Sequence, residues 1–221
     1  MPWFSIGQVM NELMKRHLEL VIEANKTTNI TRISSWDEGV LLHIEDSLTA
    51  LSEIEKAPSG RYVDLGSGAG FPGIPLAIET GRETLLVDSV RKKTDLLESF
   101  VAELQLDNVS VYNGRIEDLA REESVSFAVA TARALSKLSV LMELASPLLI
   151  KGGVLICYKA RMDSEELEHA LELQEKLGLS LVGDREFMLD ENKRRIVSFE
   201  KVHKAKVNLP RRTGLAQKQP L

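Results

Sequence analysis

The feature that most constrains this chain is the stretch of residues 61–73, where a short apolar run leads into a glycine-dense turn. The run has the β-branched and aromatic content of a buried strand, and Pro72 suits the first turn of a following helix, where a missing N–H costs nothing. Gly66, Gly68 and Gly70 permit positive φ angles and let a ligand lie against bare backbone. Open α/β sheets bind nucleotides at such turns, at the carboxyl ends of their strands. We therefore predict a nucleotide-binding α/β sheet.

Two details of the turn favour S-adenosylmethionine over a dinucleotide. A dinucleotide turn follows the pattern G-x-G-x-x-G, but Phe71 stands where the third glycine would fall. Asp64, just before the turn, would repel a pyrophosphate and could attract the cationic amino-acid part of S-adenosylmethionine. The next predicted strand ends in Asp88, where an acid can bind ribose hydroxyls. These features predict S-adenosylmethionine as the cofactor and disfavour a nicotinamide dehydrogenase.

From residue 61 onward, strand patterns alternate with helical ones, and this spacing indicates a parallel sheet with right-handed crossovers. The first five predicted strands cover residues 61–65, 84–88, 109–112, 126–131 and 153–159. Two longer runs, 180–189 and 194–202, are joined by a short polar turn and predict a hairpin. The predicted fold is α/β, a class I (Rossmann-like) S-adenosylmethionine-dependent methyltransferase fold with a seven-stranded, mostly parallel sheet.

The segments before and after the sheet predict two additions to it. Residues 3–56 show helical spacing of apolar residues, and a second helix is expected to start near Ser34 or Ser35. The apolar face of that second helix would consist of Leu41, Ile44, Leu48 and Leu51. We expect an N-terminal helical extension over residues 1–56, a methyltransferase domain over 57–203 and a basic C-terminal tail over 204–221.

The charge of the chain is unevenly distributed. The net charge is −5, but residues 192–221 hold nine Lys and Arg and one acid, a net charge of +8. The other 191 residues carry 19 cations and 32 acids, a net charge of −13. Such a split suggests a polyanionic partner that approaches from one side, although a solvated tail would give the same pattern.

Several classes of partner and cofactor are disfavoured. No apolar run approaches the roughly 20 residues that span a bilayer, so we expect no membrane partner. The single Cys157 excludes an internal disulfide and fits a reducing cytoplasm, where we expect the protein to act. The four histidines are scattered and only one thiol exists, so no metal site is predicted.

Two short segments after predicted strands carry candidate binding residues. Arg91, Lys92 and Lys93 fall in the first turn of a helix, where cations oppose the helix dipole. They could contact phosphate or simply extend into solvent. The loop at 113–117 could frame the adenine of the cofactor, or be a tight turn with Glu117 favoured at the start of a helix.

Arg133, among small residues at the end of the fourth predicted strand, could contact a ligand or substrate, or form a salt bridge at the rim. This position also lacks the Asp/Asn-Pro-Pro-aromatic motif usual in enzymes that methylate exocyclic base amines. Cytosine-C5 enzymes need a cysteine nucleophile, but Cys157 lies in an apolar strand and is expected to be a packed thiol.

His43, Asp46 and Ser47 have the residue types of a hydrolase triad. Three residues within five positions of one helix cannot easily form that relay, and no oxyanion-hole turn precedes Ser47. We expect them to line a cleft or to cap the core.

Together these segments resemble the bacterial RsmG (GidB) family of small-subunit ribosomal RNA guanine-N7 methyltransferases. The resemblance covers nearly the whole chain, and its most specific part is residues 64–76, which end in Phe-Pro-Gly-Ile-Pro-Leu. The other matching segments are Asn29-Ile-Thr31, His43 with Asp46-Ser-Leu48, Asp88-Ser89 with Lys92-Lys93, Gly114-Arg-Ile-Glu117, Thr131-Ala-Arg-Ala134, Lys159 and Pro210-Arg-Arg212. Two segments depart from the family: Ala160 replaces a usual glycine, and the tail at 214–221 lacks the usual Gly-x-Pro.

The resemblance implies S-adenosylmethionine as cofactor and 16S ribosomal RNA, or the small ribosomal subunit, as partner of a protein that we expect to be a monomer. The cofactor-binding residues that it implies are Gly66, Phe71, Asp88, Ile116, Glu117 and Arg133. From the glycine turn itself we add Asp64 and Gly68 to the predicted cofactor-binding residues, and Arg133 is also the catalytic candidate. We predict a connected phosphate-binding surface made by Arg91, Lys92, Lys93, Arg133, Lys159 and the basic end at 193–212, including Arg211 and Arg212.

The chemistry of guanine N7 fits the lack of a catalytic constellation. N7 holds an in-plane lone pair and no proton, so methylation requires positioning and no general base. Because N7 is accessible only in looped or opened RNA, we expect single-stranded or irregular RNA as the substrate. Two alternatives remain: a methyltransferase that acts on a small molecule or protein, and a non-catalytic RNA-binding or ribosome-assembly factor that retains the pocket.

Overall fold

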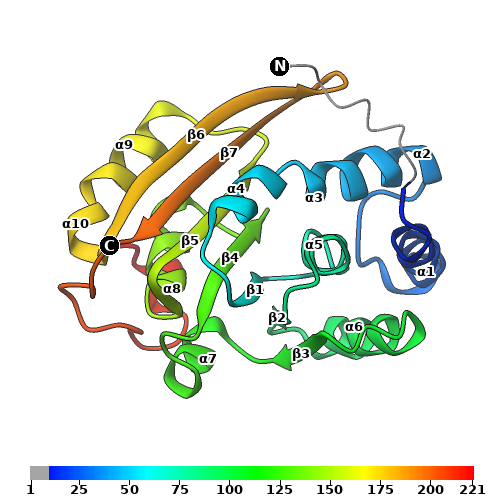
Figure 1. Ribbon diagram of the computed structural model, residues 1–221, viewed down its shortest axis with the longest axis horizontal. Helices are drawn as coiled ribbons and strands as arrows, with labels where there is room; N and C mark the ends of the chain where they lie inside the picture. The colour runs from blue at the N-terminus through cyan, green and yellow to red at the C-terminus, as the bar shows by residue number, and fades with distance from the viewer. Residues whose placement is uncertain (1–9) are drawn as a thin grey trace.

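The computed structural model describes residues 10–221 and contains a seven-stranded sheet (Figure 1). Its strands are β1 (Arg61–Leu65), β2 (Thr84–Asp88), β3 (Val109–Asn113), β4 (Phe127–Arg133), β5 (Leu149–Lys159), β6 (Leu179–Leu189) and β7 (Asn192–Lys201). The strand order is β3-β2-β1-β4-β5-β7-β6, with β1 to β5 parallel and β7 antiparallel to both neighbours. The predicted strands, the hairpin and the mostly parallel sheet are confirmed, although β5 starts four residues earlier than expected.

Helices cover both faces of the sheet (Figure 1). The helices after the N-terminal segment are α5 (Gly73–Thr80), α6 (Arg91–Glu103), α7 (Ile116–Glu122), α8 (Leu138–Ala145), α9 (Ser164–Glu172), α10 (Gln174–Leu177) and α11 (Leu215–Lys218). Val63 and Leu65 of β1 face the cluster that includes α7, α8 and α9, whereas Tyr62 faces the side of α5. Burial on both faces explains the near-continuous apolar run that precedes the glycine turn.

The order of the strands reverses at β1, because β2 pairs with one of its edges and β4 with the other. Helical crossovers therefore leave β1 and β4 toward opposite faces, and a crevice opens at the carboxyl ends of these strands. Ligands of open α/β sheets bind at this switch point. The glycine turn at residues 66–70 lies there.

The N-terminal segment contains α1 (Glu12–Thr28), α2 (Trp36–Gly39), the π-helix η1 (Val40–Glu45), α3 (Asp46–Leu48) and α4 (Leu51–Lys56). Asn11 caps α1 by accepting a hydrogen bond from the Leu13 N–H at 2.9 Å. The predicted helix start near Ser34 or Ser35 is confirmed, because α2 begins at Trp36 with Ser35 as its N-cap residue, but the π-helix and a turn divide the helix that was expected to reach Leu51. His43 lies in the π-helix and Asp46 and Ser47 directly follow it, and all three side chains are buried. The predicted helical start at residues 3–9 lies outside the described residues.

The predicted boundaries at 56/57 and 203/204 fall between α4 and β1 and after β7. Beyond β7, the C-terminal segment packs against the cluster that contains α7 and α8, and its Ala216 is fully buried. Within residues 10–221, no helix has the length and apolar character needed to cross a bilayer.

Candidate active site

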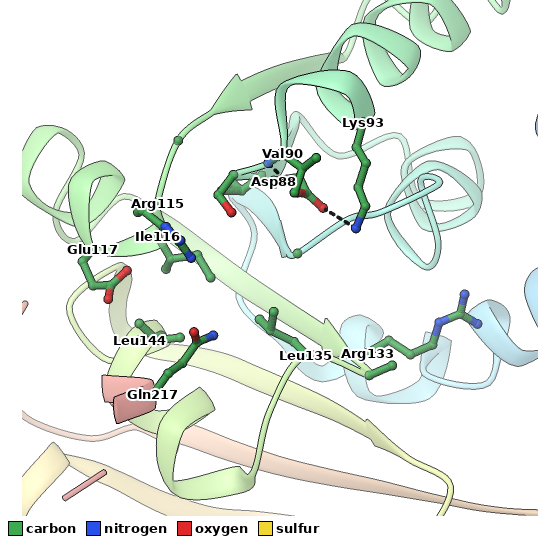
Figure 2. Close-up of a pocket in the computed structure, with 15 residues that line it drawn as sticks. Asp88, Val90, Lys93, Arg115, Ile116, Glu117, Arg133, Leu135, Leu144 and Gln217 are labelled. Atoms are coloured by element: carbon green, nitrogen blue, oxygen red, sulfur yellow. Dashed lines mark hydrogen bonds and ion pairs between the residues drawn. The ribbon is translucent and has the colours of Figure 1, made fainter. Parts of the chain in front are cut away.

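A cavity of about 230 Å³, here called the strand-end pocket, lies at the carboxyl ends of β1, β2 and β4. Of the predicted cofactor-binding residues, Gly66, Asp88, Ile116, Glu117 and Arg133 line it (Figure 2). These residues come from four different parts of the chain, and the parallel sheet brings them to one edge. This is the place where the strand order reverses.

Asp88 is fixed at the end of β2 by the backbone around it. Its Oδ2 accepts a hydrogen bond from the Gly68 N–H at 3.1 Å, and its Oδ1 accepts one from the Val90 N–H at 2.9 Å. Lys93 Nζ lies 3.7 Å from Oδ2 (Figure 2). Gly68 thus holds the acid in place and does not itself line the strand-end pocket. A carboxylate that lines this pocket is suited to bind the hydroxyls of a ribose.

Ile116 and Glu117 begin α7 on the side of the pocket away from the Arg133 guanidinium (Figure 2). Glu117 is buried in the first helical turn, where the helix dipole favours an acid. Its Oε1 accepts a hydrogen bond from the Gly214 N–H at 2.7 Å, so the C-terminal segment holds this side chain. Ile116 supplies an apolar surface beside it.

Asp64 lies behind the glycine turn and does not line the strand-end pocket. Its side chain shares a face with Tyr62, and its Oδ1 accepts a hydrogen bond from the Thr131 hydroxyl at 2.7 Å. Burial raises the pKa of Asp64 to about 6, although the bond from Thr131 opposes this rise. The expectation that Asp64 faces the cofactor finds no support in this geometry.

Phe71 is also directed away from the strand-end pocket, into the N-terminal helices. Its ring stacks on His43 at 4.3 Å and lies 4.4 Å from His17. Burial lowers the pKa of His17 to about 4. The aromatic residue of the glycine motif therefore anchors the turn to α1 and η1, and a role in direct cofactor contact has no support here.

A second and wider cavity of about 650 Å³, here called the basic cavity, adjoins the strand-end pocket and shares Arg133 and Ala134 with it. Its other cationic lining residues are Arg32, Lys159, Arg161 and Arg194. Sequence reasoning had selected Lys159 but not Arg32 or Arg161. Arg32 directly follows Thr31 and Arg161 lies two residues after Lys159, and this proximity to predicted segments is the only signal.

Arg133 lies between the two cavities, with its guanidinium directed away from the strand-end pocket (Figure 2). It donates to Asp46 Oδ2 at 2.8 Å and to the Leu42 carbonyl at 3.0 Å. The other oxygen of Asp46 accepts from Arg194 at 2.9 Å, so one buried carboxylate fixes two arginines. Of the trio noted in the sequence, Asp46 and His43 thus contact Arg133, whereas Ser47 Oγ donates to the His43 carbonyl.

His43 has a defined proton arrangement. Arg133 can only donate, so its contact with His43 Nδ1 at 3.2 Å makes Nδ1 an acceptor. The proton then lies on Nε2, which donates to the Thr31 hydroxyl at 2.9 Å. Burial, together with the charge of Arg133, lowers the pKa of His43 to about 3. His43 is therefore neutral, fully engaged and poorly suited to accept a proton.

The predicted phosphate-binding residues lie partly in the two cavities and partly outside them. Arg91 and Lys92 are exposed on α6, while Lys93 lines the strand-end pocket. Lys159 lines the basic cavity, where Glu166 pairs with it at 2.6 Å.

The basic C-terminal end is largely neutralised by the acidic body of the protein. Arg211 pairs with the buried Glu143 through contacts of 2.7 and 2.6 Å, whereas Arg212 is exposed. The cations at the C-terminal end that form ion pairs are Lys193, Arg194, Arg195, Lys206 and Arg211. The opposite charges of the two parts thus serve the fold itself, and only part of the +8 remains for a polyanion.

A model of the GidB family, described as rRNA small subunit methyltransferase G, matches residues 10–204. The chain belongs to this family. A ribosomal RNA small subunit methyltransferase G from Carboxydothermus hydrogenoformans is 37% identical over 222 residues, which cover 98% of this chain and 94% of the relative. A relative of the same name from Geobacillus sp. (strain WCH70) is 36% identical and covers 94% of this chain and 89% of its own length. Membership confirms the predicted family and the class of S-adenosylmethionine-dependent methyltransferases.

Solved structures of more distant proteins share the fold. The cofactor-bound protein Rv0187 from MTB has a TM-score of 0.64 at 17% identity and covers 89% of this chain and 93% of its own. A geranyl diphosphate C-methyltransferase from Streptomyces coelicolor, in complex with S-adenosyl-L-homocysteine, has a TM-score of 0.58 at 12% identity and covers 72% and 78%. At these identities the likeness shows the fold alone, and it confirms the class I, Rossmann-like prediction.

Proposed function

We propose that this member of the rRNA small subunit methyltransferase G family methylates N7 of a guanine in 16S ribosomal RNA, with S-adenosylmethionine in the strand-end pocket and the target base in the basic cavity. The observation that carries the proposal is the contiguity of the two cavities at Arg133 and Ala134. A methyl donor and its acceptor must meet, and two adjoining cavities let each bind its own ligand.

The residues of the strand-end pocket fit the proposed cofactor. Asp88 lines it with a carboxylate suited to ribose hydroxyls, and Ile116 offers an apolar surface for a purine ring. The φ angle of +75° at Gly66 leaves bare backbone beside the pocket, and a Cβ there would lie 2.8 Å from Leu135. When bound, S-adenosylmethionine supplies a methyl group to the N7 lone pair, and the new N–C bond forms as the S–C bond breaks.

Among the described residues that line the basic cavity, none is a free general base, and this supports a reaction in which no proton leaves the substrate. The lining acid Asp46 has both oxygens engaged by Arg133 and Arg194. His43 is held neutral with both ring nitrogens in use. N7 of guanine needs neither group, since it carries no proton. An exocyclic amine would require a proton acceptor here, and for this reason we favour N7.

The cations of the basic cavity suit the phosphates on either side of an extruded nucleotide. Arg32 and Arg161 are exposed at the cavity, and neither forms an ion pair within residues 10–221. Single-stranded or looped RNA can place a base inside and its backbone along this rim. We also propose a cytoplasmic monomer, because one chain builds both cavities and the single Cys157 is buried.

The experiment is transfer of tritiated methyl groups to unmethylated 16S ribosomal RNA, naked and in the small subunit. We expect label at a guanine N7, detected as borohydride–aniline strand cleavage. Label on a protein or small molecule, with none on RNA, would favour the alternative substrate class. S-adenosylhomocysteine binding without any transfer to either form of RNA would contradict the proposed activity and favour a binding factor.

A further inference from the structure

The C-terminal segment, residues 210–219, lies beside the strand-end pocket and is fastened to α7 and α8. Arg211 pairs with Glu143 of α8, and the Thr213 hydroxyl donates to Asp118 Oδ1 of α7 at 2.9 Å. Arg121 of α7 donates to the Arg211 carbonyl at 3.0 Å and to Thr213 at 3.1 Å. Together with the buried Ala216, these contacts fix the backbone on both sides of residue 214. The segment is therefore an ordered wall and not a free tail.

Gln217 is the residue of this segment that lines the strand-end pocket. Its side chain lies next to Leu144, on the side where Ile116 and Glu117 begin α7 (Figure 2). The carboxamide forms no hydrogen bond within residues 10–221, whereas Glu117 already accepts from the Gly214 N–H. On this side of the pocket, Gln217 is thus an uncommitted group that can both donate and accept.

We propose that Gln217 hydrogen-bonds the nucleoside of the cofactor and that the C-terminal segment is a specificity element of this site. The proposal rests on the proposed cofactor assignment of the strand-end pocket. Gly66 of the glycine turn lines one end of the strand-end pocket, Asp88 follows where the ribose would bind, and the start of α7 lines the far end. The purine ring then falls near Ile116 and Gln217. A carboxamide matches the donors and acceptors on the edge of an adenine.

The test compares Gln217→Ala with Gln219→Ala, a matched change two residues along the chain. The Gln219 side chain is exposed and does not line the pocket, and its carbonyl bond from Arg211 survives the substitution. Calorimetry gives the Kd of S-adenosylhomocysteine and of 5′-methylthioadenosine, which lacks the amino-acid part. We expect Gln217→Ala to raise both Kd values by about 3- to 10-fold, the range for one neutral hydrogen bond. Gln219→Ala should leave both unchanged.

Several outcomes would overturn the proposal. If Gln217→Ala left both Kd values unchanged, or if Gln219→Ala raised them as much, Gln217 would not contact the nucleoside. A loss for S-adenosylhomocysteine without one for 5′-methylthioadenosine places it at the amino-acid end instead. If the wild-type protein binds neither ligand, the cofactor assignment of the pocket fails, and this proposal fails with it. The unliganded melting temperature of Gln217→Ala should equal that of the wild type, since the side chain is exposed.

Discussion

The strand-end pocket and the basic cavity adjoin each other but are built in different ways. The first is shaped by backbone at the ends of three neighbouring strands, and Asp88 is held there by two N–H groups. The second is shaped by long cationic side chains from β4, β5, β7 and two loops, held in place by ion pairs such as Asp46 with Arg133. A backbone-built pocket suits one constant ligand, and a wider cavity with a charged rim suits a segment of a polymer.

The largest expected effect tests whether ion pairs hold the basic cavity in shape. We expect Asp46→Ala to lower the free energy of unfolding by about 3 kcal/mol, because it leaves Arg133 and Arg194 without their shared carboxylate. Urea unfolding measures this loss. Asp184→Ala removes a more exposed acid paired with Arg195 and should cost about 1 kcal/mol or less. Equal losses in the two variants would mean that Asp46 has no special structural role.

The reverse test acts on the strand-end pocket. We expect Asp88→Ala to weaken S-adenosylhomocysteine binding by roughly 100-fold, since two charge-assisted hydrogen bonds of about 1.5 kcal/mol each are lost. Binding of unmethylated 16S RNA fragments should change little. Asp95→Ala is the control, because Asp95 is exposed and pairs with Arg91 on α6. A comparable loss in the control, or a parallel loss of RNA binding, would show that the two sites are not separate.

The two buried histidines that pack on Phe71, His17 and His43, should make the fold sensitive to acid. The pKa values of His17 and His43 are lowered to about 4 and 3, so below pH 6.5 the unfolded chain takes up protons that the folded chain excludes. The free energy of unfolding therefore decreases as the pH decreases below 6.5. Asp64 opposes this effect between pH 6 and 4, because its pKa is raised in the folded state. Two histidines outweigh one acid, and we expect a net loss of roughly 1–3 kcal/mol between pH 7 and 5.

Urea unfolding at the two pH values measures this loss. His17→Gln should reduce the difference between pH 7 and 5, while His169→Gln, on the exposed face of α9, should leave it unchanged. If the free energy of unfolding of the wild type did not depend on pH, this would contradict the burial of His17 and His43 in their neutral form.

The smallest expected effect concerns the rim of the basic cavity. The double variant Arg32→Ala and Arg161→Ala should weaken RNA binding by about tenfold and reduce the slope of log K against log salt by about 2. Its Kd for S-adenosylhomocysteine should not change. Lys26→Ala, at the exposed end of α1, is the control for loss of positive charge. An unchanged salt slope in the double variant would exclude these arginines from phosphate contact.

The sequence predicted the sheet well, because parallel strands buried on both faces read as continuous apolar runs separated by turn residues. It also indicated Asp88, Ile116 and Glu117 as pocket residues, since Asp88 ends β2, the other two begin the helix after β3, and a parallel sheet places such positions at one edge. In this part of the molecule, the place of a residue relative to its strand in the sequence is enough to predict its place at the edge of the sheet.

The other site residues depended on information that local patterns do not hold. Strand alternation alone could not tell that Thr131 would hold Asp64 behind the turn, or that Phe71 would stack on two histidines of distant helices. The pairing of Arg211 with Glu143 joins positions 68 residues apart, so the basic end appeared free in the sequence. Gln217 had no signal, because an exposed glutamine near a terminus resembles any surface residue.

The most direct test of the account is a crystal structure of the protein with both S-adenosylhomocysteine and guanosine monophosphate. We predict S-adenosylhomocysteine in the strand-end pocket with its ribose at Asp88, and guanine in the basic cavity with N7 facing the sulfur past Ala134. A structure with guanine outside the basic cavity, or with N7 turned away from the sulfur, would contradict the proposal that the two cavities hold the methyl donor and its acceptor.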